Sequence, residues 1–180
     1  MLPPGHIAAG FLTAKALLHF IHPNLSVAQQ QSLLCWGMFF GAAPDLDLIY
    51  NFLKLKSYRI AGKGAPSHRK YLSHAPILWL IAGLTVYFLA QDDYYRTFGL
   101  LIWLGSWTHF VLDSIDYGIM WLWPFSTKFY SLRNRQADVE IGGSSFIGYL
   151  WSFAKIYSKA LTFYLEIIII ISALIIFMRY

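Results

Sequence analysis

Long apolar runs separated by short polar stretches dominate this chain. A membrane-spanning helix needs about 20 mostly apolar residues, and residues 76–90, 97–112 and 161–178 come near that length once their flanks are included. Two shorter runs, residues 7–21 and 32–43, fit short tilted spans inside a bundle or a hairpin that enters from one face. The pattern predicts an all-α, polytopic membrane helical bundle of about five helices.

The composition agrees with a protein that is embedded in a bilayer. Apolar residues make up 57% of the chain and charged residues only 13%, whereas soluble domains carry about 25% charge. The aromatic fraction of 18% suits anchoring at the lipid headgroups. A length of 180 residues suits one domain, so residues 1–180 are predicted to form a single membrane-embedded domain. No nucleic-acid partner is expected from this hydropathy.

Basic residues are concentrated between the second and third predicted spans. Residues 51–71 contain six Lys or Arg and no acidic residue, whereas the turn after the third span contains Asp92 and Asp93. Cytoplasmic loops of membrane proteins are enriched in Lys and Arg. The charge asymmetry therefore predicts that the N-terminus and the 51–71 connection face the cytoplasm, and we expect the protein in the inner (plasma) membrane of the cell.

Four motifs of histidine and aspartate residues lie at the ends of the apolar runs, and this topology places all four on the cytoplasmic side, with His19 and His22 at the opposite end of the first span. Imidazoles and carboxylates are the ligands that hold Zn²⁺, Mn²⁺ or Fe²⁺ in proteins. The candidates exceed the four ligands of one tetrahedral ion, so we expect one or two divalent ions, with Zn or Mn favoured. The predicted metal ligands are His6, Asp45, Asp47, His68, His74, His109 and Asp113.

The spacing within two of these motifs gives them a geometry. His109 and Asp113 are four residues apart, so on a helix they project from one face. Pro44 is expected to end the second helix. If the backbone then runs extended, Asp45 and Asp47 point the same way and form a carboxylate pair. The alternatives are a hydrogen-bonded pair at a helix end for the first motif and a solvated turn for the second.

Three further features have two readings each. Arg69 and Lys70 either balance an anionic substrate such as a phosphate, or form the ordinary basic flank of a span. Residues 116–130 interleave aromatic side chains around a proline, which is typical of an interfacial segment, and we expect them to roof the site or guide a substrate. Glu166, inside the last apolar run, is expected to make an interhelical hydrogen bond, with a proton-transfer role as the alternative.

The ordered set of motifs resembles the family of predicted membrane-bound metal-dependent hydrolases that is called YdjM-like. The resemblance covers residues 5–126, and a more distant similarity to zinc-dependent phospholipase C implies phosphoester or phospholipid substrates. One departure is a loop with five residues between its two histidines where many members have four, which makes His68 the least secure ligand. The matching motifs are Gly5-His6, Pro44-Asp45-Leu46-Asp47, Ser73-His74, His109-x-x-x-Asp113 and Trp123-Pro124-Phe125.

Together these features predict a membrane-bound metal-dependent hydrolase. The ion would activate water for attack on a phosphoester or lipid-like substrate. The expected catalytic residues are Asp47 and Asp113, with Asp45 as another possible base, and Arg69, which would neutralise developing charge. Membrane lipids are the expected partners. The competing prediction is a non-catalytic integral membrane protein that a metal ion stabilises.

Overall fold

The computed structural model confirms the all-α class. It describes residues 1–21, 23–55, 68–133 and 146–179, except for the side chains at positions 51, 52, 54, 55 and 68. Within these residues there is no β-strand, and Ile119 and Tyr130 form an isolated bridge. The helices are α1 (Pro3–Ile21), α2 (Val27–Ala42), α3 (Asp47–Leu55), α4 (Pro76–Leu89), α5 (Asp93–Asp113), α6 (Phe146–Tyr157) and α7 (Leu161–Met178), with short 3₁₀ helices η1 (Ala43–Leu46), η2 (His68–Lys70) and η3 (Leu72–His74).

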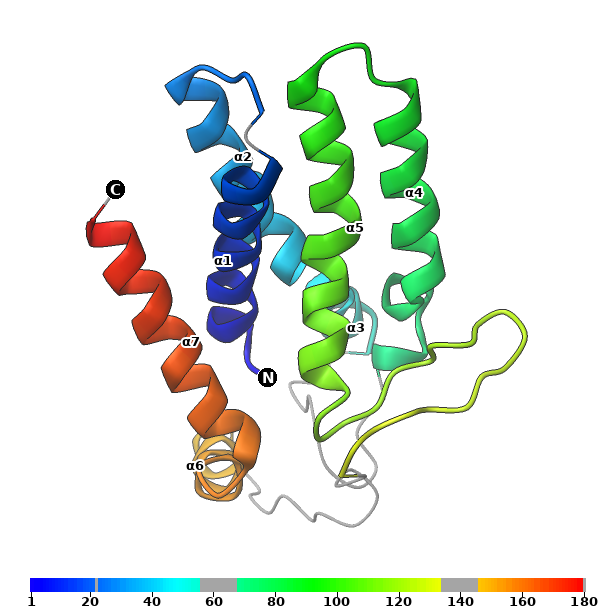
Figure 1. Ribbon diagram of the computed structural model, residues 1–180. Coiled ribbons are helices and arrows are strands. Elements are labelled where there is room, and N and C mark those ends of the chain that lie inside the picture. The colour runs from blue at the N-terminus through cyan, green and yellow to red at the C-terminus, as the bar shows by residue number, and fades with distance from the viewer. Residues whose placement is uncertain (22, 56–67, 134–145, 180) are drawn as a thin grey trace.

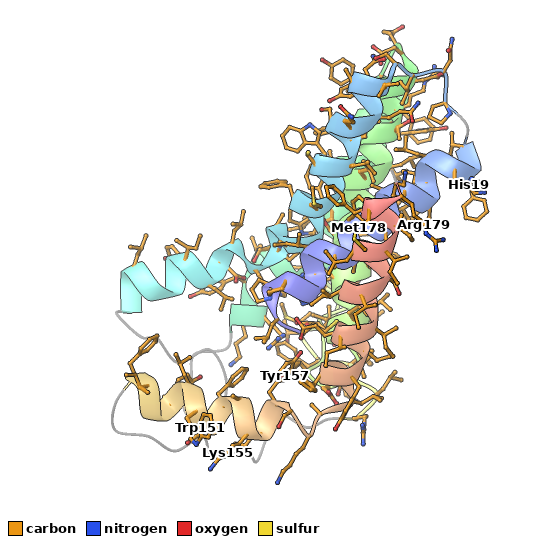
Figure 2. The ribbon with its side chains drawn as sticks, turned by 90° about the vertical axis from the view of Figure 1, so that its left-hand side faces the viewer. His19, Trp151, Lys155, Tyr157, Met178 and Arg179 are labelled. Carbon is orange, nitrogen blue, oxygen red and sulfur yellow. The ribbon has the colours of Figure 1, made fainter. Side chains whose placement is uncertain are left out.

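The long helices run side by side, and the short ones gather at one end. Figure 1 shows α1 between α7 and α5, with α2 behind it and α4 paired with α5 as a hairpin. The N-terminus and the C-terminal end of α5 lie at the same end of this bundle. Figure 2 shows α3 and α6 running across the direction of α7 at that end. The bundle therefore has one end formed by short elements and loops.

Two stretches of the described residues are long and apolar enough to cross a membrane. They are residues 27–50, which join α2, η1 and the start of α3, and α7. The first is half buried inside the protein, whereas α7 is mostly exposed, with Ile168, Ile171 and Leu174 on its outer surface. An exposed face of this kind suits contact with lipid tails. The prediction of about five spans stays a prediction, because α4 is shorter than a span and α1 and α5 are less apolar.

Glycines let the main helices approach to backbone contact. A Cβ atom added to Gly10 of α1 would lie 2.1 Å from the carbonyl oxygen of Gly37 in α2, and one added to Gly41 would lie 2.3 Å from the carbonyl oxygen of His6. The glycines of α2 are four residues apart, as in the small-residue motif that packs membrane helices. Close packing along this line brings the first turn of α1 against the end of α2.

The backbone after Pro44 is helical, so the prediction of an extended segment there is wrong. The second helix does end before Pro44, as predicted, at Ala42. The chain then continues through η1 directly into α3. Proline is tolerated in the first turn of a helix because its missing N–H needs no partner there, and Asp47 in the first turn of α3 faces the positive end of the helix dipole. As a result, Asp45 and Asp47 do not form the predicted pair on one side of an extended strand, and their carboxylates lie at different nitrogens of His74, Nε2 and Nδ1.

Candidate metal centre

Side chains from four separate elements converge where α1, η1, η3 and α5 meet. They form two groups of potential metal ligands that share His109, and within each group the ligand atoms lie within 4.8 Å of one another. The side chains of His6, His74 and His109 have no exposed surface, and those of Asp45 and Asp113 are 9% and 1% exposed. The groups are Asp45, His74 and His109, and His6, His109 and Asp113.

His109 has one ring nitrogen fixed by the backbone and the other directed at carboxylates. Its Nδ1 lies 2.9 Å from the carbonyl oxygen of Gly41, which can only accept, so Nδ1 carries the proton and donates it. Its Nε2 lies 3.6 Å from Oδ1 of Asp45 and makes no hydrogen bond with the described residues. A buried lone pair that faces a carboxylate is unfavourable unless a cation lies between them. The ring is therefore set in the tautomer that a metal ligand requires.

His74 is oriented by a carboxylate behind its ring. Nδ1 of His74 lies 2.9 Å from Oδ2 of Asp47, and the hydroxyl of Ser73 donates to the same oxygen at 2.6 Å. The opposite nitrogen, Nε2, lies 3.5 Å from Oδ1 of Asp45. A carboxylate that receives the far N–H of a metal-binding histidine is a common arrangement, because it fixes the ring and increases its basicity. Asp47 occupies that supporting position, while Asp45 faces both imidazoles.

The distances in this first group match those between ligands on one ion. Bonds of about 2.0–2.2 Å to a tetrahedral Zn²⁺ leave its ligand atoms about 3.3–3.6 Å apart. Oδ1 of Asp45 lies 3.5 Å from one imidazole nitrogen and 3.6 Å from the other. Two neutral imidazoles and one carboxylate are also a suitable donor set for Zn²⁺ or Mn²⁺. These residues therefore fit a divalent cation with little movement.

The second group contains a carboxylate whose charge is already compensated. Arg69 donates from Nε and Nη2 to Oδ2 of Asp113 at 2.8 and 2.7 Å, and the α-amino group of Met1 lies 2.7 Å from Oδ1. His6 stacks on His109 with 3.7 Å between ring centroids, and its Nε2 lies 3.2 Å from Oδ1 of Asp113 without hydrogen-bond geometry. Because two cationic groups already hold Asp113, the Asp45 group is the stronger candidate for an ion.

The predicted ligands divide into three sets. The structure brings His6, Asp45, His74, His109 and Asp113 together. It places Asp47 behind His74, and the side chain of His68 lies outside the described residues. Arg69, predicted to meet an anionic substrate, is buried against Asp113, with its guanidinium carbon 4.4 Å above the ring of Tyr117. The ligand and catalytic roles of these residues stay predictions.

Glu166 makes the interhelical hydrogen bond that was predicted for it. One carboxylate oxygen accepts the backbone N–H of Gly5 at 3.0 Å, and the other accepts the hydroxyl of Tyr157. The side chain occupies the space that a Cβ atom on Gly5 would need, 2.7 Å from Cγ of Glu166. Through Glu166, α7 is therefore hydrogen-bonded to Gly5, the residue before His6. An acidic residue inside an apolar run indicated this contact in advance, whereas nothing in the sequence indicated that Tyr157 would share it.

The aromatic segment at residues 116–130 packs beside α5. Trp121 donates from Nε1 to the hydroxyl of Ser114 at 2.8 Å, and its ring centroid lies 5.4 Å from that of Trp107. Phe125 is 95% exposed. Exposure of this kind agrees with an interfacial segment, whereas the predicted roof over the site stays a prediction.

Metal binding at His74 is expected to strengthen as pH rises. In the metal-free protein burial opposes protonation of His74, but the carboxylates of Asp45 and Asp47 more than offset it, so the pKa of His74 is raised above 6.5. Stability from this group is therefore fully present below about pH 6.5 and is lost as pH rises through the raised value. A metal needs the neutral ring, so its affinity changes in the opposite direction.

The check is to measure the Tm of the metal-free protein and the Kd for Zn²⁺ between about pH 5.5 and 8. The free protein should lose stability over this range while the affinity for the ion rises. A Kd that is independent of pH would exclude His74 as a ligand.

Comparison with known proteins identifies a family. A model of the YdjM inner membrane protein family matches residues 1–180. No curated protein and no solved structure matches the chain. The match extends the resemblance seen in residues 5–126 over the last two helices, while the distant similarity to zinc-dependent phospholipase C stays a prediction.

Proposed function

We propose that this chain, which belongs to the YdjM inner membrane protein family, is a membrane-bound metal-dependent hydrolase for a phosphoester or lipid-like substrate. The observation that carries the proposal is the placement of Asp45 between His74 and His109, at 3.5 and 3.6 Å from their Nε2 atoms. Other groups hold Nδ1 of each ring, so the Nε2 atoms of His74 and His109 both face the same buried carboxylate. This arrangement is expected of residues that bind a cation between them.

A divalent ion such as Zn²⁺ or Mn²⁺ would supply Lewis acidity, making water a better nucleophile and polarising a phosphoryl or acyl oxygen. Of the carboxylates proposed as the base, Asp47 keeps one oxygen, Oδ1, that accepts no hydrogen bond from the described residues. Both oxygens of Asp113 are engaged by cationic groups. We therefore assign the base role to Asp47, and to Arg69 the role of balancing charge around Asp113.

The proposed site faces the cytoplasm. The charge asymmetry between residues 51–71 and the Asp92–Asp93 turn supports this orientation. Asp92 caps the start of α5, and His109 and Asp113 lie at its other end. If α5 crosses the membrane, the acidic turn and the metal centre are therefore on opposite sides.

A second candidate function is that of a metal-stabilised membrane protein without catalysis. It is favoured by one observation, the complete burial of His6, His74 and His109. Structural metal sites are closed, whereas catalytic sites keep an open coordination position. The ion pair of Arg69 with Asp113 is buried as well.

One experiment separates the two functions. The purified protein in lipid nanodiscs is analysed for metal and then assayed for hydrolysis of phosphodiester and phospholipid substrates, before and after chelation. A hydrolase should turn over substrate, lose activity with the chelator and regain it with Zn²⁺ or Mn²⁺. Stoichiometric metal whose removal lowers the Tm, with no turnover of any substrate, would establish the structural role and reject the hydrolase.

A further inference from the structure

Helix α3 leaves the bundle sideways at the metal-centre end and carries apolar side chains on its outer surface. Figure 2 shows it, in cyan, running across the direction of α7 and away from the long helices. Leu46, just before the helix, and Ile49 and Leu53 within it are 50%, 57% and 70% exposed. The backbone is helical through all three, so their spacing of three and four residues places them on one face. We call this face the α3 stripe.

The α3 stripe lies where a candidate membrane span ends. Residues 27–46 form α2 and η1 and are about 32 Å long, while the hydrocarbon core of a bilayer is about 30 Å thick. Helix α2 belongs to one of the two candidate spans among the described residues. A helix that begins at the end of such a span and runs across the bundle lies in the plane of the membrane interface.

The size and charge of this region favour lipid as the occupant of the α3 stripe. A helix of nine residues is about 13 Å long and about 10 Å wide, so the stripe covers on the order of 130 Å². Each partner in a stable protein complex buries about 800 Å², which is several times more. Residues 54–63 contain four Lys or Arg and no acidic residue. Apolar side chains followed by basic residues are typical of helices that lie on anionic lipids.

A different face of α3 supports the metal centre. Asp47 follows Leu46 directly, and consecutive residues of a helix are about 100° apart. Its side chain is buried, with Oδ2 2.9 Å from Nδ1 of His74. In the described part of the chain the principal contacts of α3 are with η1 and η2, so no long helix packs extensively against it. A change in the position of α3 therefore moves Asp47 relative to His74.

We propose that the α3 stripe docks into the anionic headgroup layer on the metal-centre side of the membrane, and that this contact holds Asp47 behind His74. The coupling rests on the metal ion proposed for His74 and its partners, whereas the lipid contact does not depend on it. Metal affinity then depends on the bilayer through a helix whose stripe does not touch the ion.

The first test measures the depth of the α3 stripe. In a Cys35→Ser background, Leu53→Cys and Gln91→Cys each receive a nitroxide label in vesicles of phosphatidylcholine and phosphatidylglycerol. Gln91 is exposed in the turn at the opposite end of the bundle. The label at position 53 should be more accessible to oxygen, which concentrates in lipid, than to an aqueous nickel complex, and the label at 91 should show the reverse. Greater access of the nickel complex at 53, or exclusion of both reagents by a protein contact, would overturn the proposal.

The second test measures the coupling to the metal. Leu53→Glu should weaken Zn²⁺ binding in the same vesicles about 10-fold, the lower end of the effect of losing a supporting group, because anionic lipid repels the new carboxylate and displaces α3. Leu89→Glu makes the same change at an exposed leucine at the far end of α4 and should keep the wild-type Kd.

An unchanged Kd in Leu53→Glu would reject the coupling. Circular dichroism checks the fold, and Leu53→Ser, which removes the apolar side chain without adding a charge, replaces Leu53→Glu if that variant does not fold. A wild type that binds no Zn²⁺ would reject the metal centre together with the coupling, and the two labels would still decide whether the stripe contacts lipid.

Discussion

Replacing His109 with alanine is expected to remove the metal ion from the protein, and with it all metal-dependent turnover. His109 belongs to both groups of candidate ligands, so the substitution removes a nitrogen donor from each group. Supporting residues alone typically contribute 10–100-fold to metal affinity, so the loss of a direct ligand should weaken binding by at least about 100-fold. Elemental analysis and competition with a chelator of known affinity would measure this.

A second variant distinguishes the loss of a ligand from the loss of the fold. In His109→Asn the side-chain amide can still donate to the carbonyl oxygen of Gly41, the acceptor that Nδ1 of His109 uses, but nothing takes the place of Nε2. It should keep the helical content of the wild type and bind no metal. His19→Ala, at an exposed position near the other end of α1, should bind a full complement. Full metal content in both His109 variants would contradict the prediction that His109 is a metal ligand.

Replacing Gly10 with leucine is expected to separate α1 from α2 and to destroy the metal centre from a distance. The first atom of the new side chain would lie 2.1 Å from the backbone carbonyl oxygen of Gly37, which cannot rotate away. Overpacking in a core costs about 1–3 kcal/mol, and a clash with backbone should reach the upper part of this range. For a chain of this size that corresponds to a Tm about 6–12 °C lower.

The same substitution should also displace His6, which lies one turn before Gly10 on α1. Metal binding would then weaken although no ligand has changed. Ala16→Leu is the matched control, because Ala16 is exposed on the same helix and should tolerate the larger side chain. Thermal unfolding and the Kd for Zn²⁺ would be measured on both variants. Equal values for the two leucine variants would show that the close approach of α1 and α2 is dispensable.

The agreement between the sequence and the structure is best for features that local rules control. The α-helical hydrogen bonding of the second helix ended at Ala42, just before Pro44, as predicted. The physical reason behind that prediction failed, because Ala43, the residue before the proline, keeps helical φ and ψ angles of −58° and −36° and begins a new helical turn instead of an extended segment. A proline is compatible with either outcome, and the choice depends on the contacts that the next residues make.

The sequence also indicated which side chains would lie close together, but not which of them would face a metal ion and which would support the ligands from behind. Asp45 and Asp47 look equivalent in a motif, and His68 and His74 form a similar pair. In the folded protein Asp45 lies between two imidazoles, while Asp47 supports one of them from behind. This difference depends on the distance between η1, η3 and α5, which no local pattern encodes.

What the sequence alone determined is the apolar, all-α character of the chain and the set of histidines and aspartates near the ends of its apolar runs. These follow from composition and from spacings of a few residues, which act through local geometry. The tertiary structure alone decided that Arg69 neutralises Asp113 and that Glu166 of the last helix holds the start of the first. Each of these contacts joins residues that are far apart in the chain or on different helices, so its geometry exists only once the helices have packed.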